Sequence, residues 1–151
     1  MQPRVSAITI APGARLPMKS VQVVEAETGK GLVGDRYHGT KHRHVSVQSQ
    51  AALDVAAGEL GRPIGPEGTR RNITIDLGEV PTVPGTRIRI GPVLLEVVRV
   101  AAPCRLLDDN LGPGAMTALR RRAGTIFRVL EGGTISVGDP VDLEVAAPAA
   151  D

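Results

Sequence analysis

The sequence predicts a mainly β fold, a closed or partly open β-barrel with two or more short helices in its connections. Short segments rich in valine and isoleucine alternate apolar and polar side chains, as half-buried strands do. The chain of 151 residues contains 18 glycines and 12 prolines, which separate these segments. Only two stretches have the spacing of an amphipathic helix. Tyr37 and Phe127 are the only aromatic residues, so the core must consist of aliphatic side chains.

The strand pattern occurs in eight segments. They are residues 5–10, 21–27, 44–49, 72–77, 86–91, 93–100, 125–131 and 134–145. Glycines in the connections at 90–93 and 131–134 predict two hairpins, because glycine accepts the positive φ that tight turns need.

Two helices are expected, over residues 49–60 and 114–124. In the first, Leu53 falls on an apolar face and Ser49 is placed to cap the N-terminus. In the second, Met116 and Leu119 share a face and Gly124 ends the helix.

Length and composition restrict the organisation and the partners. We expect residues 1–145 to form one domain and residues 146–151 a flexible C-terminal tail. A net charge of +2 and two aromatic residues argue against nucleic acid as a partner. No apolar run approaches the roughly 20 residues that cross a bilayer. A single cysteine and no secretory signal predict a cytoplasmic protein with no membrane partner.

Cys104 is the only cysteine and follows Pro103, where the strand at 93–100 should have ended. A lone cysteine can be a small buried hydrophobic residue. A thiol at the end of a strand can instead be a nucleophile or a metal ligand, provided that neighbouring groups favour the thiolate. The residues alone leave both interpretations open.

The segment 32–44 contains all three histidines, His38, His42 and His44, together with Asp35. Neutral imidazoles bind transition metals, so this segment is a candidate site for a divalent ion. The alternative is a solvated loop in which glycines supply the turns.

Basic residues precede two of the predicted strands. Arg70, Arg71 and Asn72 stand before an apolar strand, and Lys19 with Ser20 precedes another. Such groups can clamp a phosphate, or they can be solvated loop residues. The phosphate-loop, dinucleotide, zinc-protease and serine-hydrolase motifs are all absent from the sequence.

The order of the short motifs resembles that of a MOSC domain, the C-terminal domain of molybdenum cofactor sulfurases and its small stand-alone bacterial relatives. The motifs are LPMKSV, GLVGDRYHG, RRNI, IGPVLLEVVRVAAPC and GTIFRVLEGGTISVGDPV, and the resemblance covers roughly residues 15–143. The resemblance implies a mainly β, barrel-like fold that binds the molybdenum–pterin (molybdopterin) cofactor.

The resemblance also implies roles for particular residues. Cys104 matches the family cysteine that ligates molybdenum or carries sulfur. The cofactor-binding positions are Lys19, Ser20, Arg36, Arg70, Arg71 and Asn72. Asp35 or His38 could relay protons.

Three functions follow from these observations. The first is a molybdenum-dependent reductase of small N-hydroxylated substrates, active as a monomer or homodimer, whose electrons come from a separate protein because the chain has no flavin, haem or iron–sulfur motif. The second is a carrier that holds a persulfide on Cys104 and receives its sulfur from a separate donor protein; the pyridoxal-phosphate half of a full sulfurase is absent. The third is a non-catalytic protein that binds a divalent ion through His38, His42 and His44.

Overall fold

The structure is a computed structural model that describes residues 2–13, 16–101, 111–119 and 122–145. The α-helices described are α1 (Gln50–Leu60) and α3 (Ala115–Ala118), and a 3-10 turn covers Pro66–Thr69. The strands are β1 (Val5–Ile10), β2 (Lys19–Val21), β3 (Val23–Glu27), β4 (Gly31–Leu32), β5 (Val45–Ser49), β6 (Ile73–Ile75), β7 (Arg87–Ile90), β8 (Val93–Val100), β9 (Thr125–Glu131), β10 (Gly133–Ser136) and β11 (Val141–Val145).

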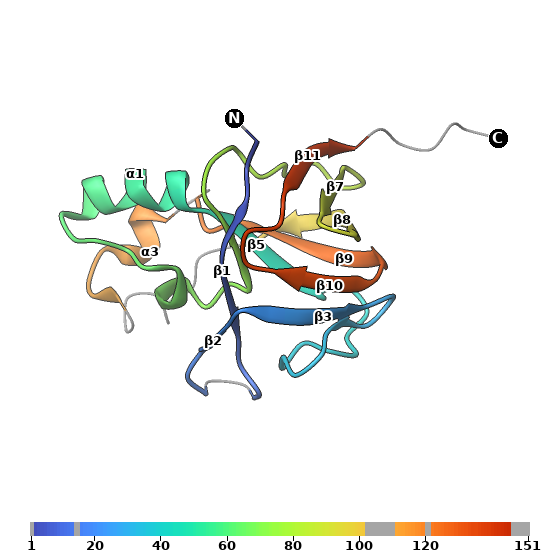
Figure 1. Ribbon diagram of the computed structural model, residues 1–151. Helices are drawn as coiled ribbons and strands as arrows, with labels where there is room; N and C mark the ends of the chain where they lie inside the picture. The colour runs from blue at the N-terminus through green and yellow to red at the C-terminus, as the bar shows by residue number, and fades with distance from the viewer. Residues whose placement is uncertain (1, 14–15, 102–110, 120–121, 146–151) are drawn as a thin grey trace.

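The described strands form two sheets and outweigh the helices, which confirms the mainly β prediction (Figure 1). The larger sheet has eight strands in the order β11-β7-β8-β9-β5-β6-β1-β2, and the smaller has the order β10-β3-β4. Strands β5 and β6 run parallel with α1 in the crossover between them. The predicted closure into a barrel is not confirmed within the described part of the chain. The start of β1 meets the segment before β11 through an isolated bridge between Arg4 and Pro140 and through backbone hydrogen bonds of Val5 to Gly138 and Asp139.

The core between the sheets is aliphatic, as the composition predicts. It is formed mainly by valine and isoleucine side chains from both sheets, with Phe127 as the one aromatic residue. Phe127 is fully buried, and it lies opposite Val45 and Val97 on the two strands that flank β9. Alternation of apolar and polar side chains along each strand therefore determines which face of the sheet meets this core.

One of the two predicted hairpins is confirmed. Ile90 pairs with Val93, so the connection at 90–93 joins β7 to β8 as a tight hairpin. The hairpin prediction at 131–134 is wrong, because β10 pairs with β3 and leaves the sheet that contains β9. Gly132 lies against the backbone of Ala26, where an added Cβ would stand 2.4 Å from the carbonyl oxygen. The glycines here permit a crossing between two sheets and not a local turn.

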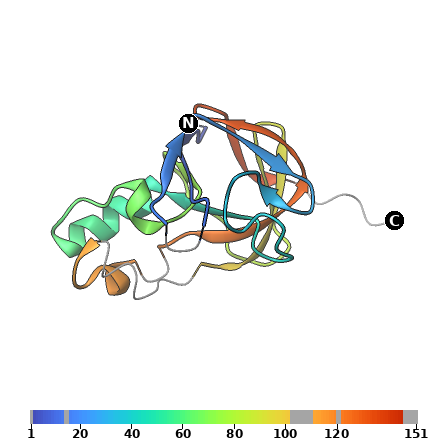
Figure 2. The ribbon, with the colours of Figure 1, turned by 90° about the horizontal axis from the view of Figure 1, so that it is seen from below.

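Helix α1 confirms the first helix prediction, with Leu53 and Ala56 buried and Gly61 ending it in the left-handed conformation. Ser49 occupies the N-cap position, but its hydroxyl donates to the carbonyl of Gly78 at 2.7 Å and does not cap the helix. The side chain thereby joins the end of β5 to the chain that follows β6. Figure 2 shows both helices together on one side of the molecule and the strands on the other.

The second helix differs from its prediction. Helix α3 spans four residues, and its buried face comprises Ala115, Ala118 and then Leu119, which pack on α1. Met116, expected on that face, is one of the exposed large hydrophobic side chains. Gly124 ends no helix; it lies directly before β9, against the backbone of Val47.

Candidate functional site

Asp35 holds the loop between β4 and β5 against the end of β1. Its side chain is fully buried. One carboxylate oxygen accepts the backbone N–H of Ala11 at 3.0 Å and the other accepts that of Tyr37 at 3.3 Å. The backbone N–H of Arg36 donates in return to the carbonyl of Ala11 at 2.7 Å. The carboxylate therefore positions the loop, and its role as a proton relay stays a prediction.

Arg36 and Arg70 meet at this anchored loop. The Arg36 guanidinium lies 3.9 Å from the Asp35 carboxylate, 3.4 Å from the Met18 sulfur and 3.5 Å from the Arg70 carbonyl. Arg70 has φ of 61°, the one positive φ outside glycine among the described residues. A side chain in that conformation costs roughly 1–2 kcal/mol, and such strain is concentrated at functional sites. The structure therefore places the Arg36 guanidinium against the backbone of Arg70, a second predicted cofactor-binding residue.

Arg71 extends toward the start of β9. It is buried, and its Nε donates to the carbonyl of Ala123 at 2.7 Å. The next carbonyl, that of Gly124, accepts the N–H of Ala101 at 3.0 Å, at the end of β8. Arg71 thus binds Ala123, and the next residue, Gly124, binds the chain where it leaves β8. Cys104 follows three residues later in the sequence and lies outside the described residues.

Asn72 connects three strands from the inside. Its Oδ1 accepts the N–H of Ser46 at 3.0 Å and the Ser46 hydroxyl at 3.1 Å. Its Nδ2 donates to the carbonyl of Thr9 at 3.2 Å. The side chain is buried, and these contacts support the segment that carries Arg70 and Arg71. Any direct contact of Asn72 with a cofactor stays a prediction.

Lys19 and Ser20 lie on the edge strand β2, opposite Ile10 and Thr9. Directly opposed residues in an antiparallel pair share a face, so Ser20 lies on the same side as Thr9, whose hydroxyl donates to the Arg71 carbonyl. Lys19, one residue away, faces the opposite side. Ser20 thus shares a face with Thr9, and Lys19 shares the other face with Ile10.

The histidines do not converge on a metal site. His38 lies 2.9 Å from Glu27, His42 is exposed, and His44 is buried beneath the loop. The His44 Nδ1 accepts the N–H of Val129 at 2.9 Å, so its Nε2 carries the proton and donates to the Thr40 carbonyl at 2.7 Å. Both ring nitrogens of His44 are therefore occupied. No group of three metal-ligating side chains is found in the described ranges, so the divalent-ion hypothesis gains no support.

Acid is expected to destabilise the protein through His44. Burial lowers its pKa below the usual 6.5, and the nearby charge of Arg128 lowers it further. The unfolded chain therefore binds this proton more readily than the folded one, and the free energy of unfolding should fall as the pH drops below about 6.5. Urea unfolding between about pH 7.5 and 5.5 measures this slope. His44→Gln should flatten it and His42→Gln should not; equal slopes in all three proteins would contradict the assignment.

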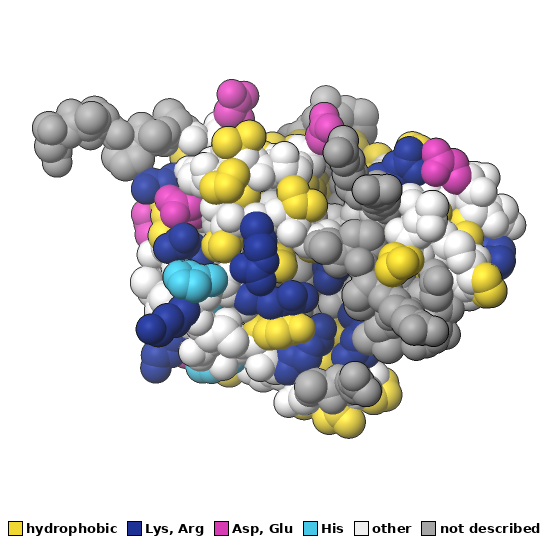
Figure 3. Space-filling model, turned by 180° about the vertical axis from the view of Figure 1, so that it is seen from behind, with side chains coloured by type: hydrophobic (Ala, Val, Ile, Leu, Met, Phe, Trp, Pro, Cys, Tyr) yellow, Lys and Arg dark blue, Asp and Glu magenta, His cyan; other side chains and the backbone are white. Residues whose placement is uncertain are grey.

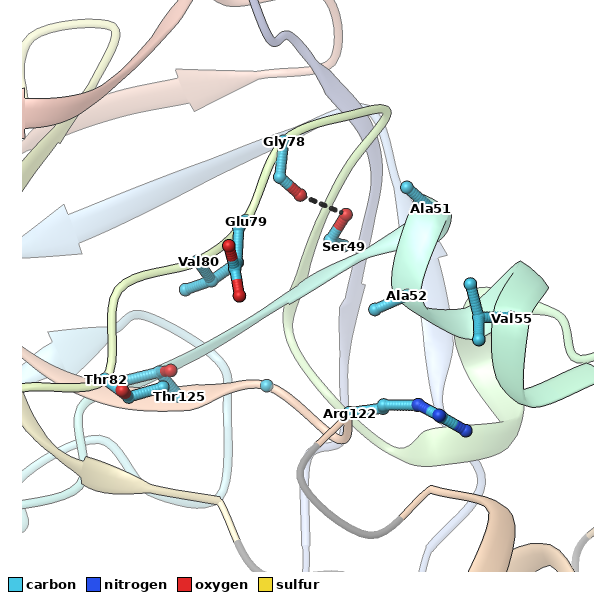
Figure 4. Close-up of a pocket in the computed structure, with 11 residues that line it drawn as sticks. Ser49, Ala51, Ala52, Val55, Gly78, Glu79, Val80, Thr82, Arg122 and Thr125 are labelled. Atoms are coloured by element: carbon cyan, nitrogen blue, oxygen red, sulfur yellow. Dashed lines mark hydrogen bonds between the residues drawn. The ribbon is translucent and has the colours of Figure 1, made fainter.

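A pocket of about 540 Å³ lies beside the same strands (Figure 4). One wall is the first turn of α1 with Ala51 and Ala52, and Gly78 and Val80 line the other. Gly124 also lines the pocket. The residue before it, Ala123, carries the carbonyl that accepts the Arg71 side chain. The lining of the pocket is partly apolar, and the half-buried Arg122, which also lines it, is paired with Glu59 at 2.6 Å. The size suits a small molecule, and Glu79 places a carboxylate in the wall.

Three residues of the site were missed by the sequence analysis: Tyr37, Arg43 and Arg99. The Tyr37 ring centroid lies 4.5 Å from the guanidinium carbon of Arg36 and 4.2 Å from that of Arg43. Figure 3 shows lysine and arginine side chains gathered on one face of the molecule. Tyr37 belongs to the motif GDRYHG. Its contact with Arg43, six residues later, depends on how the loop folds back.

The sequence matches the MOSC domain over residues 34–142, which is well over half of the chain. The chain belongs to the MOSC domain family. This confirms the resemblance drawn from the motif order. The family is associated with molybdenum-cofactor binding. No curated protein matches the sequence at a significant level.

Solved structures share the fold of this MOSC domain. The YuaD protein from Bacillus subtilis superimposes with a TM-score of 0.80 at 18% identity, over 93% of this chain and 94% of that one. YiiM from Geobacillus stearothermophilus gives 0.74 at 19% identity, over 93% and 74%. YiiM from Escherichia coli gives 0.69 at 19% identity, over 98% and 72%. At these identities the likeness concerns the fold.

The geometry of this MOSC domain fits an anionic group. Two guanidinium groups, those of Arg36 and Arg43, lie over the Tyr37 ring, and the carboxylate of Asp35 beside them is buried and bound to backbone N–H groups. Within the described residues, no helix combines the length and the apolar character needed to cross a membrane.

Proposed function

We propose that this MOSC domain binds the molybdenum–pterin cofactor and reduces N-hydroxylated small molecules with electrons from a separate protein. The observation that carries the proposal is the Arg36 guanidinium, which stands on a loop that a buried carboxylate holds in place and contacts the backbone of Arg70. Rigid guanidinium groups bind phosphate through paired hydrogen bonds, and the cofactor ends in a phosphate.

Each residue has a distinct part in this proposal. Arg36 and Arg70, with Ser20, would hold the anionic end of the cofactor. Lys19 contributes charge from the edge strand. Arg71, whose Nε is fixed on Ala123, would lie toward the metal end and favour the thiolate form of Cys104.

When bound, the molybdenum cofactor supplies the redox-active metal, and a soft thiolate ligand such as that of Cys104 suits it. The polypeptide supplies the binding groups, their orientation and the electrostatic field. His38, with a partly exposed ring held by Glu27, is better placed than the sealed Asp35 to exchange a proton with solvent. The single cysteine of the chain supports no iron–sulfur cluster, so the electrons must come from a partner.

Cys104→Ala is expected to abolish turnover of N-hydroxylated substrates and to reduce retained molybdenum. The protein would be produced with molybdate, and molybdenum and pterin would be measured per chain in the parent and in the variant. The expected result is nearly one of each in the parent and loss of molybdenum in Cys104→Ala. An Arg89→Gln variant, changed on the remote strand β7, provides the control and should retain both.

Two outcomes would contradict the proposal. Full reductase activity in Cys104→Ala would exclude the thiol as the metal ligand. Absence of molybdenum and pterin from the parent, even after reconstitution with cofactor, would exclude the cofactor protein. The persulfide carrier would then remain, and a sulfur atom released from Cys104 by a reductant would identify it.

A further inference from the structure

Arg43 and Arg99 extend the basic group beyond the two arginines assigned to the cofactor. Arg43 packs on the Tyr37 ring at 4.2 Å, from the end of the loop that Asp35 anchors. Arg99 comes from β8, where it pairs in register with Ile126. Strand β5 flanks β9 on its other edge, and there Ser46 pairs with the same Ile126. Arg99 and Ser46 therefore share one face of the sheet. Asn72 binds Ser46 on that face, directly before β6.

Among the residues that the structure describes, the positive charges in this group outnumber the negative ones. Neither Arg43 nor Arg99 forms an ion pair with any residue of the described ranges. Asp35 is the nearby acid, and its fully buried oxygens are already bound to Ala11 and Tyr37. Like charges held close together without a counterion raise the energy of the folded protein. An anion bound between them would relieve this cost.

The environment of Arg43 agrees with this imbalance. Burial lowers the pKa of its guanidinium, and the charges of Arg36 and Arg99 lower it further, while Tyr37 and Asp35 oppose them. Arg43 is half-buried and Arg99 is exposed. One guanidinium is thus held stiffly on an aromatic ring while the other remains accessible to a ligand, as a phosphate clamp requires.

We propose that Arg43 and Arg99 form a second anion subsite, beside Arg36 and Arg70, that binds the phosphate group of the substrate. The substrate class is therefore an N-hydroxylated small molecule that carries a phosphate monoester. Tyr37 positions Arg43 and does not contact the phosphate. This inference rests on the proposed function, in which Arg36 and Arg70 are occupied by the cofactor. Because the same chemistry could serve the cofactor's own phosphate, the test separates the two sources.

The test is a calorimetric titration of the intact protein with inorganic phosphate at low ionic strength, first without cofactor and then after cofactor loading. Arg43→Gln and Arg99→Gln should each weaken phosphate binding by about tenfold, the loss of one charge-assisted contact. Arg89→Gln removes the same charge from β7 and should leave the affinity within about twofold, since Arg89 is already paired with Glu131 at 3.6 Å. Arg43→Lys keeps the charge without the planar fork and should give an intermediate affinity, which covers the case in which Arg43→Gln does not fold.

The outcomes separate the two proposals. Phosphate binding that persists in the cofactor-loaded protein and depends on Arg43 and Arg99 supports the subsite. Loss of phosphate binding on cofactor loading would assign the whole group to the cofactor and overturn the inference while supporting the proposed function. Parent and variants that bind phosphate equally, or a parent that binds none, would overturn it as well. Failure to load cofactor would contradict the proposed function alone, because the cofactor-free titration would still report on the subsite.

Discussion

Replacing Gly124 with alanine is expected to destabilise the protein by about 3 kcal/mol or more, a large part of the stability of a typical domain. The φ of Gly124 is +95°, where a Cβ costs roughly 1–2 kcal/mol. An added Cβ would also stand 2.2 Å from the carbonyl oxygen of Val47, which belongs to the backbone of β5. That overlap can be relieved only by moving β5 away from the start of β9.

Gly85 provides the matched control. Its φ of +90° is nearly the same, and no atom lies within 4 Å of the position that its Cβ would take. Gly85→Ala should therefore cost only the conformational term, roughly 1–2 kcal/mol. Urea denaturation of the two variants separates the clash from the backbone strain. Equal losses would mean that β5 and β9 part without cost and that the close approach is unimportant.

The position of Gly124 connects stability with the site. Its carbonyl binds Ala101, its neighbour Ala123 binds Arg71, and it lines the pocket beside α1. A shift of this residue would therefore move the end of β8 and the Arg71 side chain together. Under the proposed function, any folded fraction of Gly124→Ala should also retain less cofactor than Gly85→Ala.

Asn72→Ala is expected to lower the free energy of unfolding by about 2–4 kcal/mol. The substitution leaves the buried N–H of Ser46 and the carbonyl of Thr9 without their side-chain partner, and each unsatisfied buried group costs about 1–3 kcal/mol. Chemical denaturation measures the loss. This loss of stability would arise from the hydrogen bonds of Asn72 inside the sheet. The motif around Asn72 suggests instead a contact with a ligand, which would leave the free energy of unfolding unchanged.

Ser46→Ala tests the same network from its other end. It removes one hydroxyl, which accepts the Asn72 N–H at 2.9 Å and donates to Asn72 Oδ1, and should cost about 1 kcal/mol. Because the two side chains share these bonds, the double variant should lose less than the sum of the single losses. Strict additivity, or an Asn72→Ala protein as stable as the parent but unable to retain cofactor, would instead assign Asn72 to the ligand.

The sequence by itself determined the features that depend on neighbouring residues. Alternating side chains predicted the strands around Phe127, and Gly91 predicted the hairpin between β7 and β8. Periodicity placed Leu53 on the buried face of α1. Turn chemistry and side-chain periodicity act within a few residues, so these features can be read locally. The order of the short motifs also indicated the MOSC family before any geometry was known.

The tertiary structure alone decided which distant groups meet. Ser49 has the residue type and the place of a helix cap, but Gly78, 29 residues away, accepts its hydroxyl. His44 belongs to a histidine-rich segment, yet Val129 and Thr40 occupy its ring. The glycines at 131–134 have the composition of a turn, but β10 finds its partner in β3.

The basic group around Tyr37 has the same origin. Arg43 and Arg99 are 56 positions apart in the sequence; Arg43 stands just before β5 and Arg99 on β8, and β9 joins these two strands in the sheet. No local pattern carries that information, since strand order results from the packing of the whole core and not from the propensity of one segment. The residue types of the site could therefore be predicted from the sequence. Which of these residues lie near one another was decided by the order of strands in the sheet.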